Sequence, residues 1–368
     1  MRDSSHYLGL DRDSIREIAA NCTHMLDGHG IRTVRERVQE VADSPLSLLR
    51  NDNYGRGGFV SDFEKEVATL LGMEAAVFMP SGTMAQQIAL RIWSDRVEIK
   101  TVAFHPTSHL HMHEQMGYQE LHGLNAVLLG EPYRLFVLDE LRAVSEPVST
   151  LLIELPQREI GGQLPTWSEL VDICEEARSK GMRLHLDGAR LWECAPFYAR
   201  SYAEIAALFD SVYVSFYKIL DGLPAAMLLG PQSFIDEART WQRRQGGNLY
   251  QQSPSAISAK LGLDRHLPRI PEYVAKAKEI ADVLRTFDQI TVIPEHPQTN
   301  MMHLRFEGDR ERLLAASMQI ADEERIGLFF YLTDKVQYEL GVGESALGID
   351  SVRLRELFER LFLLADSV

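Results

Sequence analysis

The segment from Arg183 to Trp192 reads RLHLDGARLW, and the segment from Phe209 to Lys218 reads FDSVYVSFYK. Both show the apolar alternation that is typical of β-strands. The first strand ends at Asp187, before a glycine, and the second ends at Lys218. Ligands of parallel sheets gather where the strands give way to loops, so we expect a carboxylate and an amine at one edge of a sheet.

Each of these charged residues also has an ordinary structural explanation. Asp187 fits a strand-end aspartate that caps the following turn, and most lysines are surface charges. However, Lys218 ends a strand that otherwise buries large apolar residues, and it follows Asp187 by one βα unit. An amine held in an apolar site has a lowered pKa and can serve as a Schiff-base nucleophile. The two residues together therefore favour a functional site.

Strands and helices alternate through the middle of the chain. Further strand-like runs lie at residues 75–80, 125–130 and 149–156, and helical patterns separate them. One helix is expected to begin after Thr166, which forms a capping box with Glu169. The alternation predicts an α/β fold with a mostly parallel sheet flanked by helices.

The length of 368 residues exceeds what a single core usually fills, so more than one domain is expected. Residues 1–50 are polar and helix-like, and we expect an N-terminal arm there. Residues 51–255 are expected to form the large domain. After about residue 255 the pattern changes, and residues 256–368 are expected to form a smaller α+β domain.

The composition excludes several classes of function. A net charge of -15 argues against nucleic-acid binding, which needs a positive surface. No run approaches the roughly 20 apolar residues of a membrane helix, and the first residues lack the apolar run of a signal peptide. Three cysteines without a CxxC pair fit a reducing compartment. We expect a cytoplasmic protein that binds neither nucleic acid nor membrane.

The segment MPSGTMAQQ, residues 79–87, adds a third element. A turn of Ser81, Gly82 and Thr83 that opens a helix offers N–H groups, a hydroxyl and the helix dipole to a phosphate. The same pattern also occurs as plain N-capping. A phosphate cradle with a strand-end lysine and aspartate fits pyridoxal phosphate (PLP). The lysine would bind the aldehyde, and the aspartate would keep the ring nitrogen protonated.

The segment FHPTSHLHMHEQMG, residues 104–117, holds four histidines and a glutamate, which raises the alternative of a metal site. His109, His111 and His113 alternate, so a strand would place them on one side and a helix would scatter them. Nothing else in the sequence requires these histidines to meet around a metal ion, so we expect no metal site. His105, His111 and His113 are expected to line the pocket or a subunit contact.

The segments around these residues resemble the fold-type I PLP enzymes, and among them the threonine aldolase and β-eliminating lyase family. The resemblance covers residues 50–255, in the family's order, through NYGRGGFVSDFEKEVATLLGMEAAVFMPSGTMA, SHLHMHEQMGYQELHG, GGQLPTWSELVDICEEARSKGMRLHLDGARLW, FDSVYVSFYKILDGLPAAMLLGP and RRQGGNLYQQ. It implies PLP as the cofactor, an amino acid as the substrate and a homodimer or homotetramer.

The resemblance also implies roles for individual residues. Lys218 would bind the cofactor aldehyde, and Asp187 would pair with the ring nitrogen. His109, which lies five residues before Glu114, would stack on the ring. The other implied residues contact the phosphate or the substrate: Gly82 and Thr83, with Ser215 as a further candidate, for the phosphate; Arg190 for the α-carboxylate; and Tyr54, in a YG segment that approaches the site from the same or a neighbouring subunit.

Four departures from the family pattern affect the substrate and the phosphate. Gln157 stands where the family histidine contacts the β-hydroxyl of the substrate. The phosphate-binding arginine is absent from GGNLYQQ, where Tyr250 or its neighbours stand and Arg243 or Arg244 are possible substitutes. The segment DKVQYELGVGE lacks the late arginine that is a second carboxylate ligand, and Cys22 replaces an N-terminal serine.

The expected reaction is aldol cleavage of L-threonine, L-allo-threonine or another β-hydroxy-α-amino acid to glycine and an aldehyde. The main rival is PLP-dependent β-elimination, in which Lys218 removes the α-proton and a group leaves Cβ. A non-catalytic PLP-binding protein is a third alternative. A metal hydrolase built on the histidines is the last.

Overall fold

The computed structural model describes residues 4–367. It divides into two compact units: one holds residues 34–268, and the other joins the segment before residue 34 to the segment from residue 269 onward. Residues 1–3, the start of the expected N-terminal arm, lie outside the described part. None of the helices within residues 4–367 combines the length and apolar character that crossing a bilayer requires.

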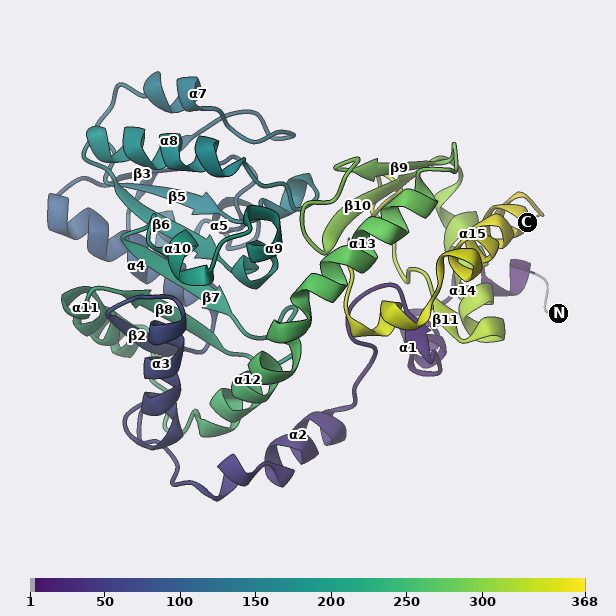
Figure 1. Ribbon diagram of the computed structural model, residues 1–368, viewed down its shortest axis with the longest axis horizontal. Helices are drawn as coiled ribbons and strands as arrows, with labels where there is room; N and C mark the ends of the chain where they lie inside the picture. The colour runs from purple at the N-terminus through teal and green to yellow at the C-terminus, as the bar shows by residue number, and fades with distance from the viewer. Residues whose placement is uncertain (1–3, 368) are drawn as a thin grey trace. The chain divides into compact units, whose positions relative to one another are not determined.

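The larger unit is built on a seven-stranded sheet, and it confirms the predicted α/β fold (Figure 1). The strand order is β2-β8-β7-β6-β5-β3-β4. The pairs from β7 to β4 are all parallel, whereas β8 runs antiparallel to both β2 and β7. The strands are β2 Ala75–Met79, β3 Thr101–Phe104, β4 Asn125–Leu128, β5 Thr150–Glu154, β6 Arg183–Gly188, β7 Ser211–Ser215 and β8 Ala226–Gly230.

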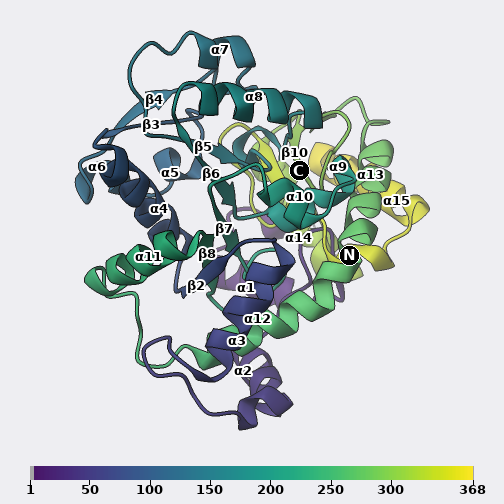
Figure 2. The same ribbon diagram turned by 60° about the vertical axis from the view of Figure 1, so that its left-hand side comes forward.

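Helices cover both faces of this sheet, and Figure 2 shows α4 and α8 on opposite sides of the strands. The α-helices of this unit are α2 Val34–Asp43, α3 Gly58–Leu70, α4 Gly82–Val97, α5 His109–Met112, α6 Gly117–Glu120, α7 Leu138–Arg142, α8 Trp167–Ser179, α9 Ala195–Tyr198, α10 Tyr202–Ala206, α11 Gln232–Arg244 and α12 Ser253–His266. Short 3-10 turns are η2 Pro45–Leu48, η3 Arg158–Ile160 and η4 Leu191–Glu193.

Local sequence patterns account for several of these elements. The predicted capping box is present at the start of α8, where the Thr166 hydroxyl accepts from the Glu169 N–H at 3.3 Å and the Glu169 carboxylate accepts from the Thr166 N–H at 2.8 Å. Cys174 is fully buried on the apolar face of α8, so it belongs to the core. The alternation in β7 turns Tyr213 toward α4, into a cluster that includes Ala85 and Ile88.

The smaller unit is an α+β domain. Its antiparallel sheet has the order β12-β10-β9, and a second pair joins β1 to β11 in parallel. Its elements are η1 Ser4–Tyr7, α1 Arg12–Ala20, β1 His24–Met25, α13 Ile270–Leu284, β9 Ile290–Ile293, β10 Met301–Phe306, α14 Arg310–Glu324, β11 Ile326–Gly327, β12 Gln337–Gly341, η6 Glu344–Gly348 and α15 Ser351–Ser367; η5 Leu267–Arg269 lies at its boundary.

The observed unit boundaries differ from the expected ones at residues 50 and 255. Most of the expected arm belongs to the smaller unit, because β1 pairs with β11 and the Tyr7 hydroxyl donates to Asp322 at 2.7 Å. The helix α12 belongs to the larger unit, where the buried carboxylate of Asp52 accepts from the Ser253 N–H at 2.8 Å. Both boundaries depend on contacts between distant parts of the chain, so local composition does not reveal them.

Candidate active site

The ends of β5, β6 and β7 form the candidate active site. In the parallel register Glu154 pairs with Asp187, and Lys218 follows shortly after β7 ends at Ser215. Both carboxylates and the amine line one cavity, together with His109, Leu155, Pro156, Arg158, Ala189 and Arg190. The structure therefore brings together four of the predicted site residues: Lys218, Asp187, His109 and Arg190.

Charges that are buried together shift one another's pKa in this cavity. Burial lowers the pKa of Lys218, and the Arg190 guanidinium adds to this effect, while Asp187 and Glu154 oppose it. Burial raises the pKa of Asp187 against the attraction of Lys218. Burial, and then the charge of Asp187, raises the pKa of Glu154 to about 7. An amine with a lowered pKa beside two buried carboxylates is typical of a functional site.

His109 begins α5, and its ring is held by Glu114. The Nδ1 atom lies 3.1 Å from Glu114 Oε1, and this hydrogen bond raises the pKa of His109 against the effect of burial. Glu114 is itself fixed by Gln87, whose Nε2 donates at 3.1 Å. The backbone N–H of His109 donates to Glu154 Oε2 at 3.0 Å. His109 is therefore held by hydrogen bonds at both its backbone N–H and its ring Nδ1 atom.

The other histidines of this segment have separate partners, because α5 is a short helix and not a strand. His111 Nδ1 lies 3.2 Å from the Tyr118 hydroxyl, and His113 Nε2 lies 2.7 Å from Glu159 Oε1. His105 Nε2 faces the backbone carbonyl of Arg134 at 2.8 Å. The helix gives His111 a separate partner, but it keeps the rings of His109 and His113 together, one turn apart, with 5.1 Å between their centres.

Ser81, Gly82 and Thr83 open α4 as predicted. Ser81 is the N-cap, and its hydroxyl accepts from the Met84 N–H at 3.3 Å. At Gly82 there is no space for a side chain, because a Cβ there would lie 1.9 Å from the Tyr213 hydroxyl. The first turn of this 16-residue helix therefore presents backbone N–H groups beside a tyrosine hydroxyl.

Ser215 does not have the environment expected of a phosphate ligand. It is almost fully buried, and its hydroxyl donates to the Ala189 carbonyl at 2.6 Å. Its own carbonyl accepts from the Trp192 indole at 2.8 Å. Ser215 therefore ties β7 to the turn that carries Asp187 and Arg190.

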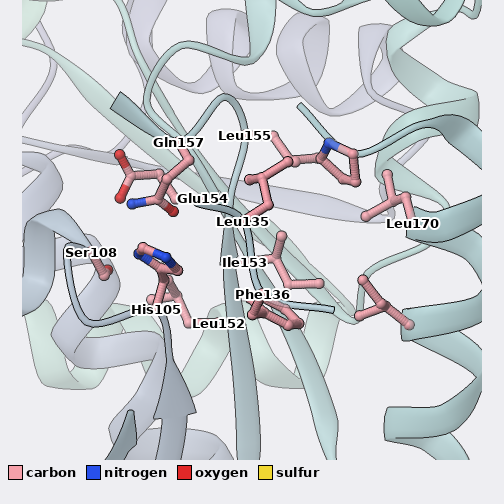
Figure 3. A pocket seen from close by; sticks show the side chains of 12 residues that line it. His105, Ser108, Leu135, Phe136, Leu152, Ile153, Glu154, Leu155, Gln157 and Leu170 are labelled. Atoms are coloured by element: carbon pink, nitrogen blue, oxygen red, sulfur yellow. The ribbon is translucent and has the colours of Figure 1, made fainter. Parts of the chain in front are cut away.

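Gln157 was expected to contact the substrate, but its side chain lines a different cavity. Figure 3 shows Gln157, Glu154 and His105 together at one end of that cavity, opposite apolar side chains. The Gln157 amide donates to Thr107 Oγ1 at 3.2 Å, and Gln157 does not line the cavity of Lys218, although the two cavities share Glu154 and Leu155. The neighbouring Arg158 lines the Lys218 cavity instead.

Arg190 and Tyr54 occupy very different environments. Arg190 lines the Lys218 cavity, and its NH1 lies 3.5 Å from Glu193 Oε1. Tyr54 lies at the surface of the larger unit, where its ring packs against Tyr250 with 5.4 Å between the ring centres. The structure of one chain therefore brings Arg190, but not Tyr54, to the cavity.

Glu154 is a site residue that the sequence reasoning missed. Its two carboxylate oxygens accept from the N–H groups of His109 and Arg158, at 3.0 and 3.1 Å. It thereby fixes two residues that line the cavity. Glu154 could have been identified from the sequence. It ends the strand next to the one that ends with Asp187, and the same rule about strand ends applies to both residues.

These residues fit PLP on physical grounds. A buried carboxylate whose pKa is raised by burial would be stabilised by a cationic ring nitrogen, and Asp187 is such a group. A buried amine with a lowered pKa suits attack on an aldehyde, as Lys218 requires. The first turn of α4 offers N–H groups to a phosphate.

Fold and cavity together define a fold-type I enzyme that uses PLP. The family model described as β-eliminating lyase matches residues 48–307. The chain belongs to the β-eliminating lyase family, whose members are PLP-dependent lyases.

Relatives with names support this family. Low-specificity L-threonine aldolase 1 of Arabidopsis thaliana is 28% identical over 271 residues, which are 71% of this chain and 75% of the relative. A Listeria monocytogenes structure, provisionally named an L-allo-threonine aldolase, is 41% identical with a TM-score of 0.91 and covers 97% of this chain and 99% of its own. An Exiguobacterium structure, provisionally named an aromatic amino acid β-eliminating lyase/threonine aldolase, is 41% identical with a TM-score of 0.90 and covers 96% of this chain and 100% of its own.

Proposed function

We propose that this enzyme cleaves β-hydroxy-α-amino acids such as L-allo-threonine and L-threonine to glycine and an aldehyde. The observation that carries the proposal is the single cavity lined by Lys218, Asp187, Arg190 and His109. The names of the Arabidopsis and Listeria relatives support the choice of substrate. Gln157 stands in place of the family histidine and lines another cavity, so β-elimination remains the rival reaction. The name of the Exiguobacterium relative includes both activities.

In this proposal each cavity residue has a distinct task. Bound PLP supplies an electron sink for the electron pair left at Cα when a bond there breaks. Lys218 holds the cofactor and, once released, carries a proton at Nζ. Asp187 keeps a positive charge on the ring nitrogen. Arg190 binds the α-carboxylate, because its planar fork can make two parallel hydrogen bonds.

His109 is the side chain best placed to accept the proton of the β-hydroxyl. Its Nδ1 donates to Glu114, which leaves Nε2 as the acceptor of the neutral ring. Gln157 is a poor base and lines another cavity. His109 would therefore both stack on the cofactor and take up the proton.

This role predicts how Glu114→Gln changes the pH dependence. Glu114 raises the pKa of His109, and the neutral ring is the active form, so activity is lost as pH falls through that pKa. Removing the carboxylate lowers the pKa of His109, and the acid limb of kcat/KM is expected to move to lower pH. Glu339→Gln, which changes a carboxylate 3.8 Å from the His303 ring in the smaller unit, is the matched control and should leave that limb in place. An unmoved limb in Glu114→Gln would exclude His109 as the base.

Product analysis with L-allo-threonine tests the proposed reaction. Aldol cleavage gives acetaldehyde and glycine in equal amounts, which a coupled aldehyde reduction and amino-acid analysis detect. Elimination of water gives a 2-oxo acid and ammonia instead. Ammonia without aldehyde would support the rival reaction, and no turnover of any amino acid despite bound PLP would support a non-catalytic binding protein.

We also propose that the enzyme assembles as a homodimer or homotetramer in the cytoplasm. Tyr54 and Tyr250 are exposed side by side on the larger unit, so the YG segment is available to a second subunit. The three free cysteines fit a reducing compartment. Light scattering of the purified protein would give the number of subunits, and a monomer would contradict the assembly.

A further inference from the structure

Two tyrosine hydroxyls lie at the first turn of α4, where the phosphate cradle was predicted. Tyr213 projects from β7, and Tyr217 lies immediately before Lys218. Their hydroxyl oxygens are 3.3 Å apart. The Tyr213 hydroxyl is so close to Gly82 that a side chain there would collide with it. The tyrosine pair therefore adjoins the backbone that opens the helix.

The N–H of Gly82 donates toward the Tyr217 hydroxyl. This places the hydroxyl beside the backbone N–H groups that would bind an anion at the helix N-terminus. Tyr213 is buried and Tyr217 is partly exposed, so one hydroxyl of the pair lies in the core and the other belongs to a side chain that solvent can reach. Tyr217 immediately precedes Lys218, the lysine that would bind the cofactor, in the chain.

Both hydroxyls are able to donate a hydrogen bond at neutral pH. Burial raises the pKa of Tyr217, and it raises the pKa of Tyr213 well above the usual value. A hydroxyl that keeps its proton can turn that proton toward an anion. Hydrogen bonds to a charged acceptor are stronger than those between neutral groups.

Of the two arginines predicted as substitutes for the missing phosphate ligand, Arg243 is exposed on α11 and Arg244 contacts an aromatic ring. The guanidinium of Arg244 lies over the Trp241 ring, 4.6 Å from its centre. Arg239, one helical turn earlier, donates to Glu64 at 2.6 Å. The tyrosine pair is a set of side-chain hydroxyls that lies against Gly82.

We propose that the Tyr217 hydroxyl, oriented by Tyr213, donates a hydrogen bond to the phosphate of PLP at the first turn of α4. It fills the role that an arginine has in the family resembled by the sequence. Gly82 is required there because Tyr213 occupies the space of a side chain. The inference rests on the cofactor and not on which bond at Cα is broken.

The test compares PLP with pyridoxal, which lacks only the phosphate. Apo forms of the wild type, Tyr217→Phe and Tyr213→Phe are titrated with each compound, and binding is followed by visible absorbance. Tyr217→Phe is expected to weaken PLP binding about tenfold to a hundredfold, as for one hydrogen bond to a charged group. Its affinity for pyridoxal should stay within about twofold. Tyr213→Phe should show a smaller loss that is also confined to PLP.

Three outcomes would overturn the proposal. Equal loss of PLP and pyridoxal in Tyr217→Phe would mean that the tyrosine contacts the ring and not the phosphate. Unchanged affinities would mean that it contacts neither. A phosphate-specific loss in Arg243→Gln or Arg244→Gln, with Tyr217→Phe unaffected, would assign the phosphate to an arginine. Because no turnover is needed, each of these results leaves the proposed aldol cleavage untouched.

Discussion

Replacing Lys218 with alanine is expected to abolish the visible absorbance of the cofactor-loaded protein and to lower kcat by roughly 10²–10⁴-fold. The reason is that Lys218 is the lysine that lines the cavity, and burial of its amine lowers its pKa. The substitution removes both the covalent attachment of PLP and the group that carries protons at Cα. Absorbance spectra and steady-state rates on L-allo-threonine measure the two losses separately.

Lys260→Ala is a suitable control for this experiment. Lys260 pairs with Glu66 and Asp264, away from the cavity. Its replacement should leave the absorbance and the rate near those of the wild type. A Lys218→Ala protein that retained the visible band after dialysis would contradict the assignment of the cofactor lysine.

Asp187→Asn is expected to lower kcat by about 10²–10³-fold, the usual size of a lost electrostatic contact in a dry site. Asparagine keeps the shape of the side chain but removes the charge that holds the ring nitrogen protonated. Because Lys218 is intact, the protein should still bind PLP and remain coloured. Rates measured at saturating PLP separate this loss from a loss of affinity.

Glu154→Gln provides the comparison for Asp187→Asn. Glu154 carries the other carboxylate of the cavity, but it accepts from two backbone N–H groups and so has a positioning role. Its replacement should cost less in kcat than Asp187→Asn. The reverse order would indicate that Glu154, and not Asp187, is the partner of the ring nitrogen.

The sequence predicted the residues whose placement follows from local patterns. Strand alternation and the following turns locate Asp187 and Lys218, and parallel order brings them to one sheet edge. His109 and Glu114 were singled out by the family resemblance, and their side chains are hydrogen-bonded across five residues. The α/β fold could be predicted for the same reason, because each βα unit carries its own periodicity.

Residues that depend on distant contacts could not be predicted in the same way. The Gln157 amide is hydrogen-bonded to Thr107, fifty residues earlier in the chain, and the Ser215 hydroxyl is hydrogen-bonded to the carbonyl of Ala189. The tyrosine pair at Gly82 arises only when β7 packs beside α4. No local pattern reveals these contacts, because each joins residues that are far apart in the chain or in different elements.

The most direct test of the central claim is to locate the cofactor on the chain. The purified, PLP-loaded protein is reduced with borohydride, digested, and its peptides are weighed by mass spectrometry. The account predicts one modified peptide, with the mass of a reduced PLP group on Lys218. Modification of a different lysine, or none in a protein saturated with PLP, would contradict the assignment of this cavity as the active site.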